Sequence, residues 1–164
     1  MDDQNQAPAG NGEDTLPSIG IISQYVKDLS FENPNSPAIY QSQTQPQIDV
    51  QFNIGATPVA ENVTEVVLKI DVRAEAGDQV AYVVELAYAG LFAFRNIPAD
   101  QLQPFLLGEA PRLLFPFARR ILADVIRDGA FPQLMLEPID FNALYFQQMQ
   151  GQIDGQQSEE IGHA

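Results

Sequence analysis

The stretch VTEVVLKIDVRAEAGDQVAYVVELAYAGLFAF, residues 63–94, decides the fold class of this chain. Its first part alternates apolar and polar residues with the period of two that is typical of a half-buried β-strand. The apolar positions predicted to face inward are Val66, Leu68, Ile70 and Val72. Ala76, Gly77 and Asp78 then supply a short turn, and a long apolar run follows. The pattern predicts two long antiparallel strands joined as a hairpin.

Two further strand patterns precede this hairpin. Residues 19–32 (IGIISQYVKDLSFE) mix β-branched and aromatic residues and end at a loop sequence rich in Asn and Pro. Residues 47–54 (QIDVQFNI) alternate strictly between apolar and polar side chains. In the fourth strand, residues 78–94, Gly90 predicts a bend or a β-bulge. Because the connections are tight or moderate in length, the four strands are expected to form one antiparallel sheet.

The hydrophobic period changes to that of a helix after Pro98. Residues 109–129 (EAPRLLFPFARRILADVIRDG) repeat apolar side chains at four-residue spacing, which predicts a helix. The stripe with this spacing consists of Leu113, Phe117, Ile121 and Val125. Gly129 stands where a C′ glycine commonly ends a helix. Pro116 is expected either near the first turn or at a kink.

A short helix is predicted at residues 141–150 (FNALYFQQMQ), with Asp140 placed to cap its first turn. The extended segment before it contains Leu134 and Leu136, which are expected to pack in the core. Strands first and helices afterwards predict an α+β fold, in which helices pack on one face of a four-stranded antiparallel sheet. The other face of such a sheet can remain open.

Composition restricts the classes of function. The chain has 164 residues, enough for one domain with a sizeable core. It carries 22 Asp and Glu against 8 Lys and Arg, a net charge of −14, which disfavours nucleic acid and anionic membrane surfaces as partners. The absence of cysteine excludes disulfides and fits a cytoplasmic location. Neither a membrane-spanning apolar stretch nor a secretory signal is recognisable, so membrane insertion is not expected.

The two ends differ from the middle in composition. Residues 1–18 are rich in Asn, Gln, Gly, Pro and Asp and lack a hydrophobic pattern, so a disordered acidic tail is expected. Residues 151–164 are similar and are expected to form a flexible acidic tail. The folded domain is therefore predicted to span residues 19–150.

No set of residues typical of catalysis or of cofactor binding is recognisable. The single histidine, His163, lies next to the C-terminus, and no metal-binding Cys/His set, phosphate-binding loop or serine hydrolase motif is present. One class of enzyme or ligand-binding protein stays open. It is a small α+β cone that uses one buried carboxylate with a raised pKa to bind or isomerise an apolar molecule.

Apolar residues exceed the needs of a simple core at two points. Both faces of the strand at residues 82–88 are apolar except for Glu85. One row is therefore either an exposed interface or buried in the centre of the sheet, and the two interpretations are given equal weight. The last helix carries apolar side chains all round, at Phe141, Leu144, Tyr145, Phe146 and Met149. Such a helix needs another subunit, a groove or a ligand in addition to the core.

Several of these segments together resemble the SecB family of protein-export chaperones. The resemblance is carried by YVKDLSFENPNSP (25–37), TEVVLKIDVRAE (64–75) and the run from LFPFAR (114–119) to GAFPQLMLEPIDF (129–141). It implies a homotetramer, a dimer of dimers with the long helices between the two dimers. It also implies a cytoplasmic, ATP-independent holdase rather than an enzyme. Such a holdase keeps precursor polypeptides unfolded and delivers them to the export motor SecA.

The resemblance also implies roles for residues at matching positions. SecA contacts are implied for Asp28, Glu32, Val83, Glu85 and Leu86, with dimer stability as the alternative for Val83 and Leu86. A hydrophobic groove for the client is implied for Val50, Phe52 and Tyr145, and more loosely for Phe141, Leu144 and Met149. For Phe141 and Leu144, ordinary core packing is the preferred interpretation. The acidic residues 152–164 are expected to contribute to SecA binding.

The same resemblance leaves a second chaperone function open. A SecB-like relative can use this fold for one dedicated client, for example beside a toxin–antitoxin pair. Genomic neighbourhood would separate this function from general export, whereas the residues alone do not.

Overall fold

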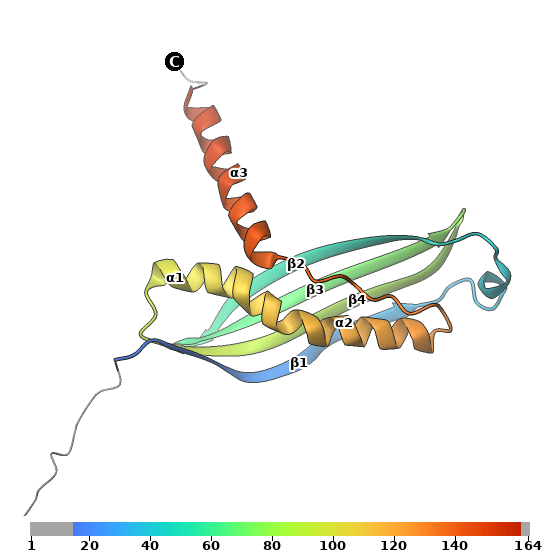
Figure 1. Cartoon of the computed structure of the whole chain (residues 1–164), viewed down its shortest axis with the longest axis horizontal. Coiled ribbons are helices and arrows are strands. Elements are labelled where there is room, and N and C mark those ends of the chain that lie inside the picture. The colour runs from blue at the N-terminus through green and yellow to red at the C-terminus, as the bar shows by residue number, and fades with distance from the viewer. Residues whose placement is uncertain (1–14, 162–164) are drawn as a thin grey trace, which may run out of the picture.

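The computed structural model describes residues 15–161 and places one four-stranded sheet against a run of helix (Figure 1). In chain order the elements are β1 (Ser18–Glu32), the 3-10 turn η1 (Ala38–Gln41), β2 (Gln47–Ala60), β3 (Val63–Ala76), β4 (Gln79–Arg95), α1 (Ala99–Pro104), the π-helical turn η2 (Phe105–Glu109), α2 (Ala110–Asp128) and α3 (Phe141–Ile161). The strand order is β1-β4-β3-β2, and all neighbouring strands are antiparallel. The predicted α+β sheet is confirmed.

Tight turns join the three consecutive strands β2, β3 and β4. Gly77 and Asp78 form the predicted hairpin turn, and Gly77 has a φ of +62°, which glycine adopts without steric cost. β2 continues past the predicted end at residue 54 to Ala60, and the turn into β3 contains Asn62 with a φ of +57°. β2 pairs with β3 from Gln47 onward and lies at the edge of the sheet. The sheet therefore ends on one side in a long strand whose outer edge is unpaired among the described residues.

The bulge predicted at Gly90 is not present. Gly90 pairs in regular register with Gln24 of β1 and Val66 of β3, while the register shifts of the β1–β4 pair fall on β1, next to Ile22 and Lys27. A Cβ on Gly90 would lie 2.9 Å from Leu114 Cδ2 and 2.9 Å from a ring carbon of Phe92. Gly90 thus allows close approach between β4 and α2, which is a different reason for a glycine in a strand.

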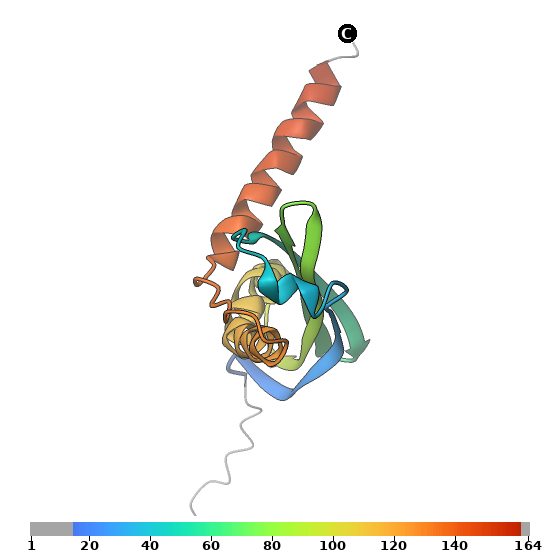
Figure 2. The ribbon, with the colours of Figure 1, turned by 90° about the vertical axis from the view of Figure 1, so that its right-hand side faces the viewer.

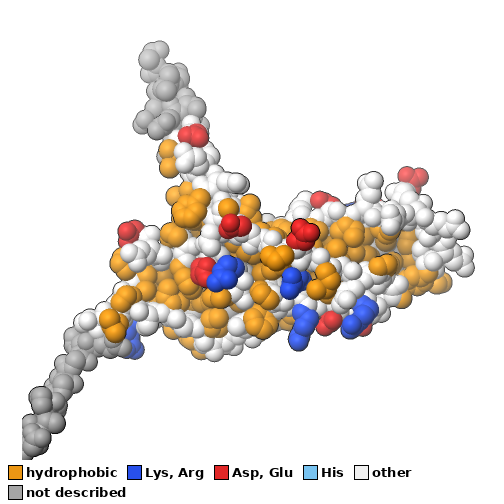
Figure 3. All heavy atoms as spheres, in the orientation of Figure 1, with side chains coloured by type: hydrophobic (Ala, Val, Ile, Leu, Met, Phe, Trp, Pro, Cys, Tyr) orange, Lys and Arg blue, Asp and Glu red, His pale blue; other side chains and the backbone are white. Residues whose placement is uncertain are grey.

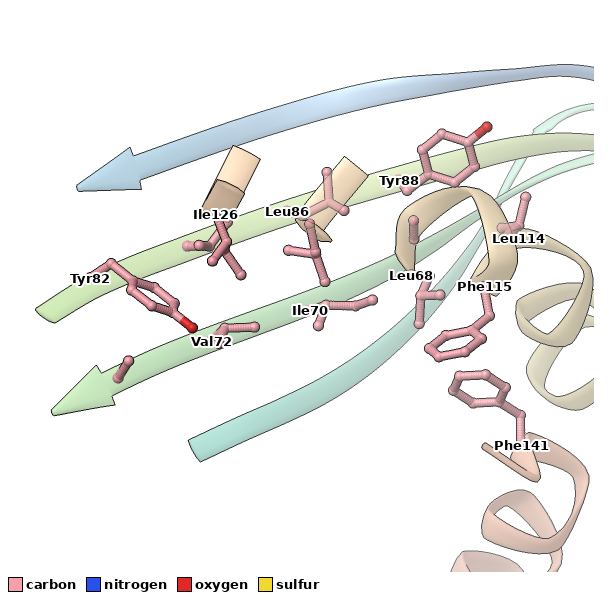
Figure 4. Packing of buried hydrophobic residues seen from close by; sticks show 14 of the residues in the cluster. Leu68, Ile70, Val72, Tyr82, Leu86, Tyr88, Leu114, Phe115, Ile126 and Phe141 are labelled. Atoms are coloured by element: carbon pink, nitrogen blue, oxygen red, sulfur yellow. The ribbon is translucent and has the colours of Figure 1, made fainter. Parts of the chain in front are cut away.

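The core lies between the inner face of the sheet and α2 (Figure 4). The inward positions predicted in β3, from Val66 to Val72, are at most 1% exposed. Further members from β4 and α2 are Tyr82, Leu86, Tyr88, Leu114, Leu122 and Ile126. Each fully buried aliphatic side chain of this kind stabilises the fold by about 1.5–3 kcal/mol relative to an exposed one. The sheet and α2 thus form the stable body of the molecule.

The predicted helix is confirmed, and the face of α2 that packs on the sheet adjoins the stripe of four-residue spacing. Its buried side chains include Leu114, Phe115, Ala118, Leu122, Ala123 and Ile126. In the predicted stripe, Phe117 is 47% exposed, and Leu113, Ile121 and Val125 are only half-buried. α2 is thus apolar on two adjoining faces, and the contact with the sheet decides which of them is fully buried.

The helical region also begins earlier and ends differently than predicted. α1, η2 and α2 follow one another without a break from Ala99, so Pro116 lies in the interior of the helix and Pro111 in its first turn. At the C-terminus, Ala130 rather than Gly129 has the left-handed conformation, with a φ of +63°. Phe131 N–H donates to Ile126 O at 3.3 Å and Ala130 N–H to Arg127 O at 2.9 Å, which is a Schellman motif.

Gly129 has a packing role at this helix end. A Cβ at this position would lie 2.4 Å from Cζ of Phe31 in β1, so a larger residue would separate the end of α2 from the sheet. The hydroxyl of Tyr40 in η1 donates to Gly129 O at 2.9 Å. The connection between β1 and β2 is therefore attached to the end of α2.

α3 leaves the body of the molecule at an angle and extends away from it (Figures 1 and 2). The predicted cap is confirmed, because Asp140 Oδ1 accepts a hydrogen bond from the N–H of Ala143 at 2.9 Å. α3 continues to Ile161, so the C-terminal tail expected from residue 151 is helical over much of its length. The tail expected at residues 1–18 lies mostly outside the described residues, as does His163.

Candidate functional site

An apolar pocket opens between β2 and the start of α3, and we name it the β2–α3 groove. Its volume is about 140 Å³, and side chains from β2, η2 and α3 surround it. The lining residues are Phe52, Asn53, Ile54, Leu107, Phe141, Leu144, Tyr145 and Gln148. The groove combines aromatic and aliphatic walls with the polar residue Gln148 of α3 and the backbone of β2 at Asn53. This combination suits a ligand with apolar side chains and polar backbone groups, such as a polypeptide.

The groove exists because α2 does not cover the whole sheet. α2 packs against β4, β3 and β1, while β2 lies beyond it. The inward residues Val50, Phe52 and Ile54 of β2 are consequently only half-buried, whereas the corresponding row of β3 is fully buried. Strict alternation in β2 thus provides a row of apolar side chains that the core does not use completely.

The first turns of α3 form the opposite wall. Phe141 is 1% exposed, and its ring makes edge-to-face contacts with Phe52 at 6.2 Å and Phe115 at 5.8 Å between centroids. Tyr145 is half-buried and Leu144 is 39% exposed. The preferred interpretation as core is therefore correct for Phe141, which forms the floor of the groove, and wrong for Leu144, which lies at its rim.

The structure brings together four of the six residues predicted for the client groove. Val50 packs against the core next to Phe52, and Met149 lies farther along α3 with 41% exposure, so neither lines the pocket itself. The lining residues that were not predicted are Asn53, Ile54, Leu107 and Gln148. Ile54 belongs to the recognised alternating pattern of β2, whereas Leu107 lies in a helical segment that the sequence pattern did not predict.

The acidic residues predicted to contact SecA lie together on the outer face of the sheet, opposite α2. In the ladder Asp28 pairs with Ala87, Glu32 with Val83, and Glu85 with Asp71, which places these side chains on one face. Asp28, Glu32 and Glu85 are exposed, and none of the three forms an ion pair with a described residue. Two shallow hollows adjoin Glu85, with Lys69 and Arg73 in their walls.

Leu86 does not belong to this outer surface. Its side chain points toward α2 in the core and is 1% exposed, so the prediction of a direct SecA contact for Leu86 is wrong (Figure 4). The cause is the alternation of β4, which sends Val83 and Glu85 outward and Leu86 inward. The row beyond Glu85 is largely covered, with Ala87 7% and Ala89 0% exposed. On the outer face of β4, Ala87 and Ala89 are therefore buried, whereas Val83 is half-buried and Glu85 is exposed.

Another carboxylate on the outer face, Glu65, is fully engaged within the chain. Lys27 Nζ lies 2.6 Å from Glu65 Oε1, and the hydroxyl of Tyr25 donates to the other carboxylate oxygen. The hydrogen bond from Lys27, followed by that from Tyr25, lowers the pKa of Glu65, and the same carboxylate raises the pKa of Tyr25. The outer face therefore contains both paired carboxylates and unpaired ones, and only the unpaired ones are free to attract a basic partner.

A further exposed apolar surface joins β1 to α2. Ile21, Val26 and Leu29 of the edge strand β1 are 41%, 44% and 41% exposed, and Phe117 of α2 stacks on Tyr88 with a centroid distance of 6.3 Å. Hydrophobic side chains are also visible across the α2 side of the molecule in Figure 3. Exposed apolar surface beside an unpaired strand edge is typical of an interface between subunits.

The described residues contain no arrangement that would support catalysis by metal or by a buried acid. No group of three or more His, Cys, Asp or Glu side chains in this part of the chain is placed to hold a metal ion. The two carboxyl groups with clearly displaced pKa values, Glu65 and Glu109, both have lowered values, because Lys27 and Arg112 donate hydrogen bonds to them. The cone-enzyme hypothesis requires a buried carboxylate, and among residues 15–155 every Asp and Glu is half-buried or exposed.

The described helices include none that is both long enough and apolar enough to cross a membrane.

The fold and the site together define a class of protein. It is a binding protein with an α+β body, on which a groove lined mostly by apolar residues and an acidic sheet face are described.

Comparisons with known proteins specify the family. The family described as "Preprotein translocase subunit SecB" matches residues 12–152. "Protein-export protein SecB" of Sphingopyxis alaskensis is 60% identical over 98% of this chain and 91% of its own length. The protein of the same name from Zymomonas mobilis is 61% identical over 98% of both chains. The chain belongs to the SecB family of protein-export chaperones, which is not a family of enzymes.

A solved structure shows the same fold at low sequence identity. The Mycobacterium tuberculosis Rv1957 SecB-like chaperone, in complex with a ChAD peptide from the Rv1956 HigA1 antitoxin, superposes with a TM-score of 0.62 and 16% identity. The similarity covers 74% of this chain and 90% of that one. At this identity the comparison supports the fold, and it agrees with the sheet and helix order described above.

Proposed function

We propose that the chain is an ATP-independent holdase of the cytoplasm, which binds unfolded precursor polypeptides in the β2–α3 groove and delivers them to SecA. The observation that carries this function is the groove, where apolar side chains of β2, η2 and α3 converge on one open pocket. Unfolded clients share little besides apolar side chains and unpaired backbone groups. The groove offers aromatic walls for the apolar side chains and the polar residue Gln148 for the backbone groups.

Two of the comparisons support a polypeptide ligand and a role in export. The SecB-like chaperone from Mycobacterium tuberculosis was solved with a bound peptide, and we extend peptide binding to this chain. The relatives of about 60% identity are named for protein export. General export is therefore favoured over service to one dedicated client.

SecA is proposed to bind the outer face of the sheet. Asp28, Glu32 and Glu85 provide unpaired negative charge there, and Val83 provides a half-buried apolar contact between them. Such a surface would attract a basic partner over a distance and raise its rate of association. We propose that the acidic C-terminal residues 152–164 act as a second contact. The groove and the acidic face lie on different sides of the sheet, so client and SecA can bind together.

Assembly as a dimer of dimers is part of the proposal. The exposed apolar side chains of β1 and the exposed Phe117 of α2 supply surface that a second subunit would cover. Residues 19–150 would form the assembling domain, with tails on either side. Several grooves in one tetramer would let one long client bind at more than one of them and gain avidity.

Native mass spectrometry with and without a reduced, unfolded precursor tests this function. We expect a mass of four chains, and a complex with the unfolded precursor that forms without nucleotide. The folded form of the same precursor is the matched control and is expected not to bind. A strictly monomeric protein that ignores unfolded polypeptide would overturn the proposal.

A further inference from the structure

The junction between η2 and α3 is unusually close. Gly108 of η2 is buried against the first turn of α3, and a Cβ on Gly108 would lie 2.2 Å from Oδ1 of Asn142 and 3.3 Å from its Cα. The first distance is far below an ordinary contact, and the second involves backbone, which a side-chain rotation cannot move away. A side chain at this position would require the Asn142 side chain to rotate and the first turn of α3 to shift slightly.

The carboxylate of Glu109 also connects the two helical segments at this junction, because it accepts hydrogen bonds from both of them. Glu109 accepts hydrogen bonds from Arg112 in α2, with 2.9 Å between Nε and Oε2, and the Nη2 group of Arg112 contacts the other oxygen. The amide of Asn142 donates to Oε2 of Glu109 at 3.4 Å. One side chain thus connects the start of α2 to the first turn of α3.

This junction bears directly on the groove. α3 packs against η2 and then projects away from the body, as Figure 1 shows. Leu106 of η2 is buried in the core while its neighbour Leu107 lines the groove. Tyr145 and Gln148 stand one and two turns beyond the junction on the opposite wall. A small change in the direction of α3 at Asn142 therefore moves that wall relative to β2.

We propose that Gly108, Glu109 and Asn142 form a support that sets the direction of α3, and thereby the opening of the β2–α3 groove. These are positioning residues, since among them none lines the pocket. Their effect on client binding rests on the proposed function, whereas their effect on the direction of α3 does not. The π-helical geometry of η2 accords with this role, because such turns frequently occur at functional sites.

Spin labels can measure the direction of α3 in the full-length protein, because the natural chain has no cysteine. Asn53→Cys in β2, between the groove-lining Phe52 and Ile54, and Gln152→Cys farther out on α3 give one labelled pair. In this background we expect Gly108→Ala, and more strongly Gly108→Val, to shift the distance distribution between the labels. Gly155→Ala is the matched control, because a Cβ there meets nothing within 4 Å. An unshifted distribution in both Gly108 variants would overturn the inference.

Client affinity, measured on the unlabelled variants with an unfolded precursor peptide, is the second readout. We expect Gly108→Val to weaken binding about tenfold, which corresponds to about 1.4 kcal/mol, while circular dichroism and native mass match the parent protein. Glu109→Gln is expected to have a smaller effect in the same direction. A shifted α3 with unchanged affinity would overturn the link to groove opening. If the parent protein itself does not bind the peptide, the proposed function fails, and the label distances still decide whether the support exists.

If Gly108→Val does not fold, Gly108→Ala and Asn142→Ala provide the same two readouts. Asn142→Ala removes the amide that reaches Glu109 without adding volume, and it is expected to broaden the label distances. A distribution as narrow as that of the parent protein would contradict a positioning role for Asn142.

Discussion

α2 and α3 are helices of similar length, 19 and 21 residues, that are held in different ways. α2 lies on the sheet and buries side chains along its length, from Ala110 to Ile126. Among residues 141–155 of α3, Phe141 alone is fully buried, while Phe146 and Ile153 are 61% and 48% exposed. Apolar side chains that reach the sheet stabilise the fold, and similar side chains beyond its edge remain available for another molecule. Whether an apolar side chain stabilises the fold or remains available for binding therefore depends on its position relative to the sheet and not on its residue type.

The largest effect is expected on the free energy of unfolding, when a buried side chain of α2 is shortened to alanine. Leu122 is 0% exposed, so Leu122→Ala should lower the free energy of unfolding by about 2–5 kcal/mol through lost contacts and a cavity. Leu144→Ala in α3 is the matched variant, and its effect on stability should stay below about 1 kcal/mol because Leu144 is at the rim. Urea unfolding at one fixed protein concentration measures both. Equal losses for the two leucines would break the contrast between the helices.

The next effect concerns binding rather than stability. Tyr145→Ala and Leu144→Ala should each weaken the affinity for an unfolded precursor peptide by up to about tenfold, because each removes apolar surface from the groove wall. Val59→Ala, a 53% exposed apolar position outside the pocket lining, serves as the control and should leave the affinity unchanged. Fluorescence anisotropy of a labelled peptide gives the values. If Val59→Ala weakens binding as much as the groove variants, clients bind apolar surface without regard to the groove.

A smaller effect is expected on the affinity for SecA, when one negative charge on the outer face of the sheet is removed. Glu85→Gln should lower the affinity for SecA about threefold, with a larger loss at low salt where charges are less screened. Glu75→Gln provides a control on the same face, because Arg73 already pairs with Glu75 at 2.7 Å. Surface plasmon resonance at two ionic strengths measures both variants. Peptide affinity should be the same in both, since the groove lies on the other side of the sheet.

The smallest effect is a dependence on pH at the α3 junction. The hydrogen bond from Arg112, followed by that from Asn142, lowers the pKa of Glu109 below its ordinary value. The stability that Glu109 contributes is therefore present above the ordinary pKa of about 4.3 and is lost as the pH falls through the lowered folded-state pKa. Because the pair is partly exposed, the effect should remain below about 1 kcal/mol.

Acid titration of unfolding in parent protein and Glu109→Gln isolates this contribution. The difference between the two should shrink as the pH falls, since protonation removes the charge that the variant already lacks. A difference that is constant between neutral and acidic pH would show that the charge of Glu109 does not stabilise the junction.

Much of the fold could be predicted from patterns among residues that are close in sequence. The alternation in β2 and β3, the Gly77 turn and the Asp140 cap depend on neighbouring residues and were confirmed. Phe52 and Tyr145 were predicted for one groove from the family resemblance, and the structure places both in the same pocket. Whether that pocket binds clients stays a prediction.

The incorrect predictions have two causes. The exposure of Leu144 depends on which element lies opposite, and periodicity gives no information about this. The SecA contact of Leu86 was implied by the family resemblance alone, and the alternation of β4 turns this side chain into the core. Gly90 and Gly129 were interpreted as local backbone signals, whereas Leu114 and Phe31 from other elements explain why a glycine is needed at each position.

The sequence by itself determined the order of the four strands and the two long helices, the acidic charge and the family, because period, composition and motif are properties of the chain read in order. Only the tertiary structure decided that the sheet extends beyond α2, that β2 and α3 form a groove there, and that Gly108 and Asn142 meet at its base. Burial and close approach depend on residues distant in the chain, so these features arise only when the sheet and the helices pack together.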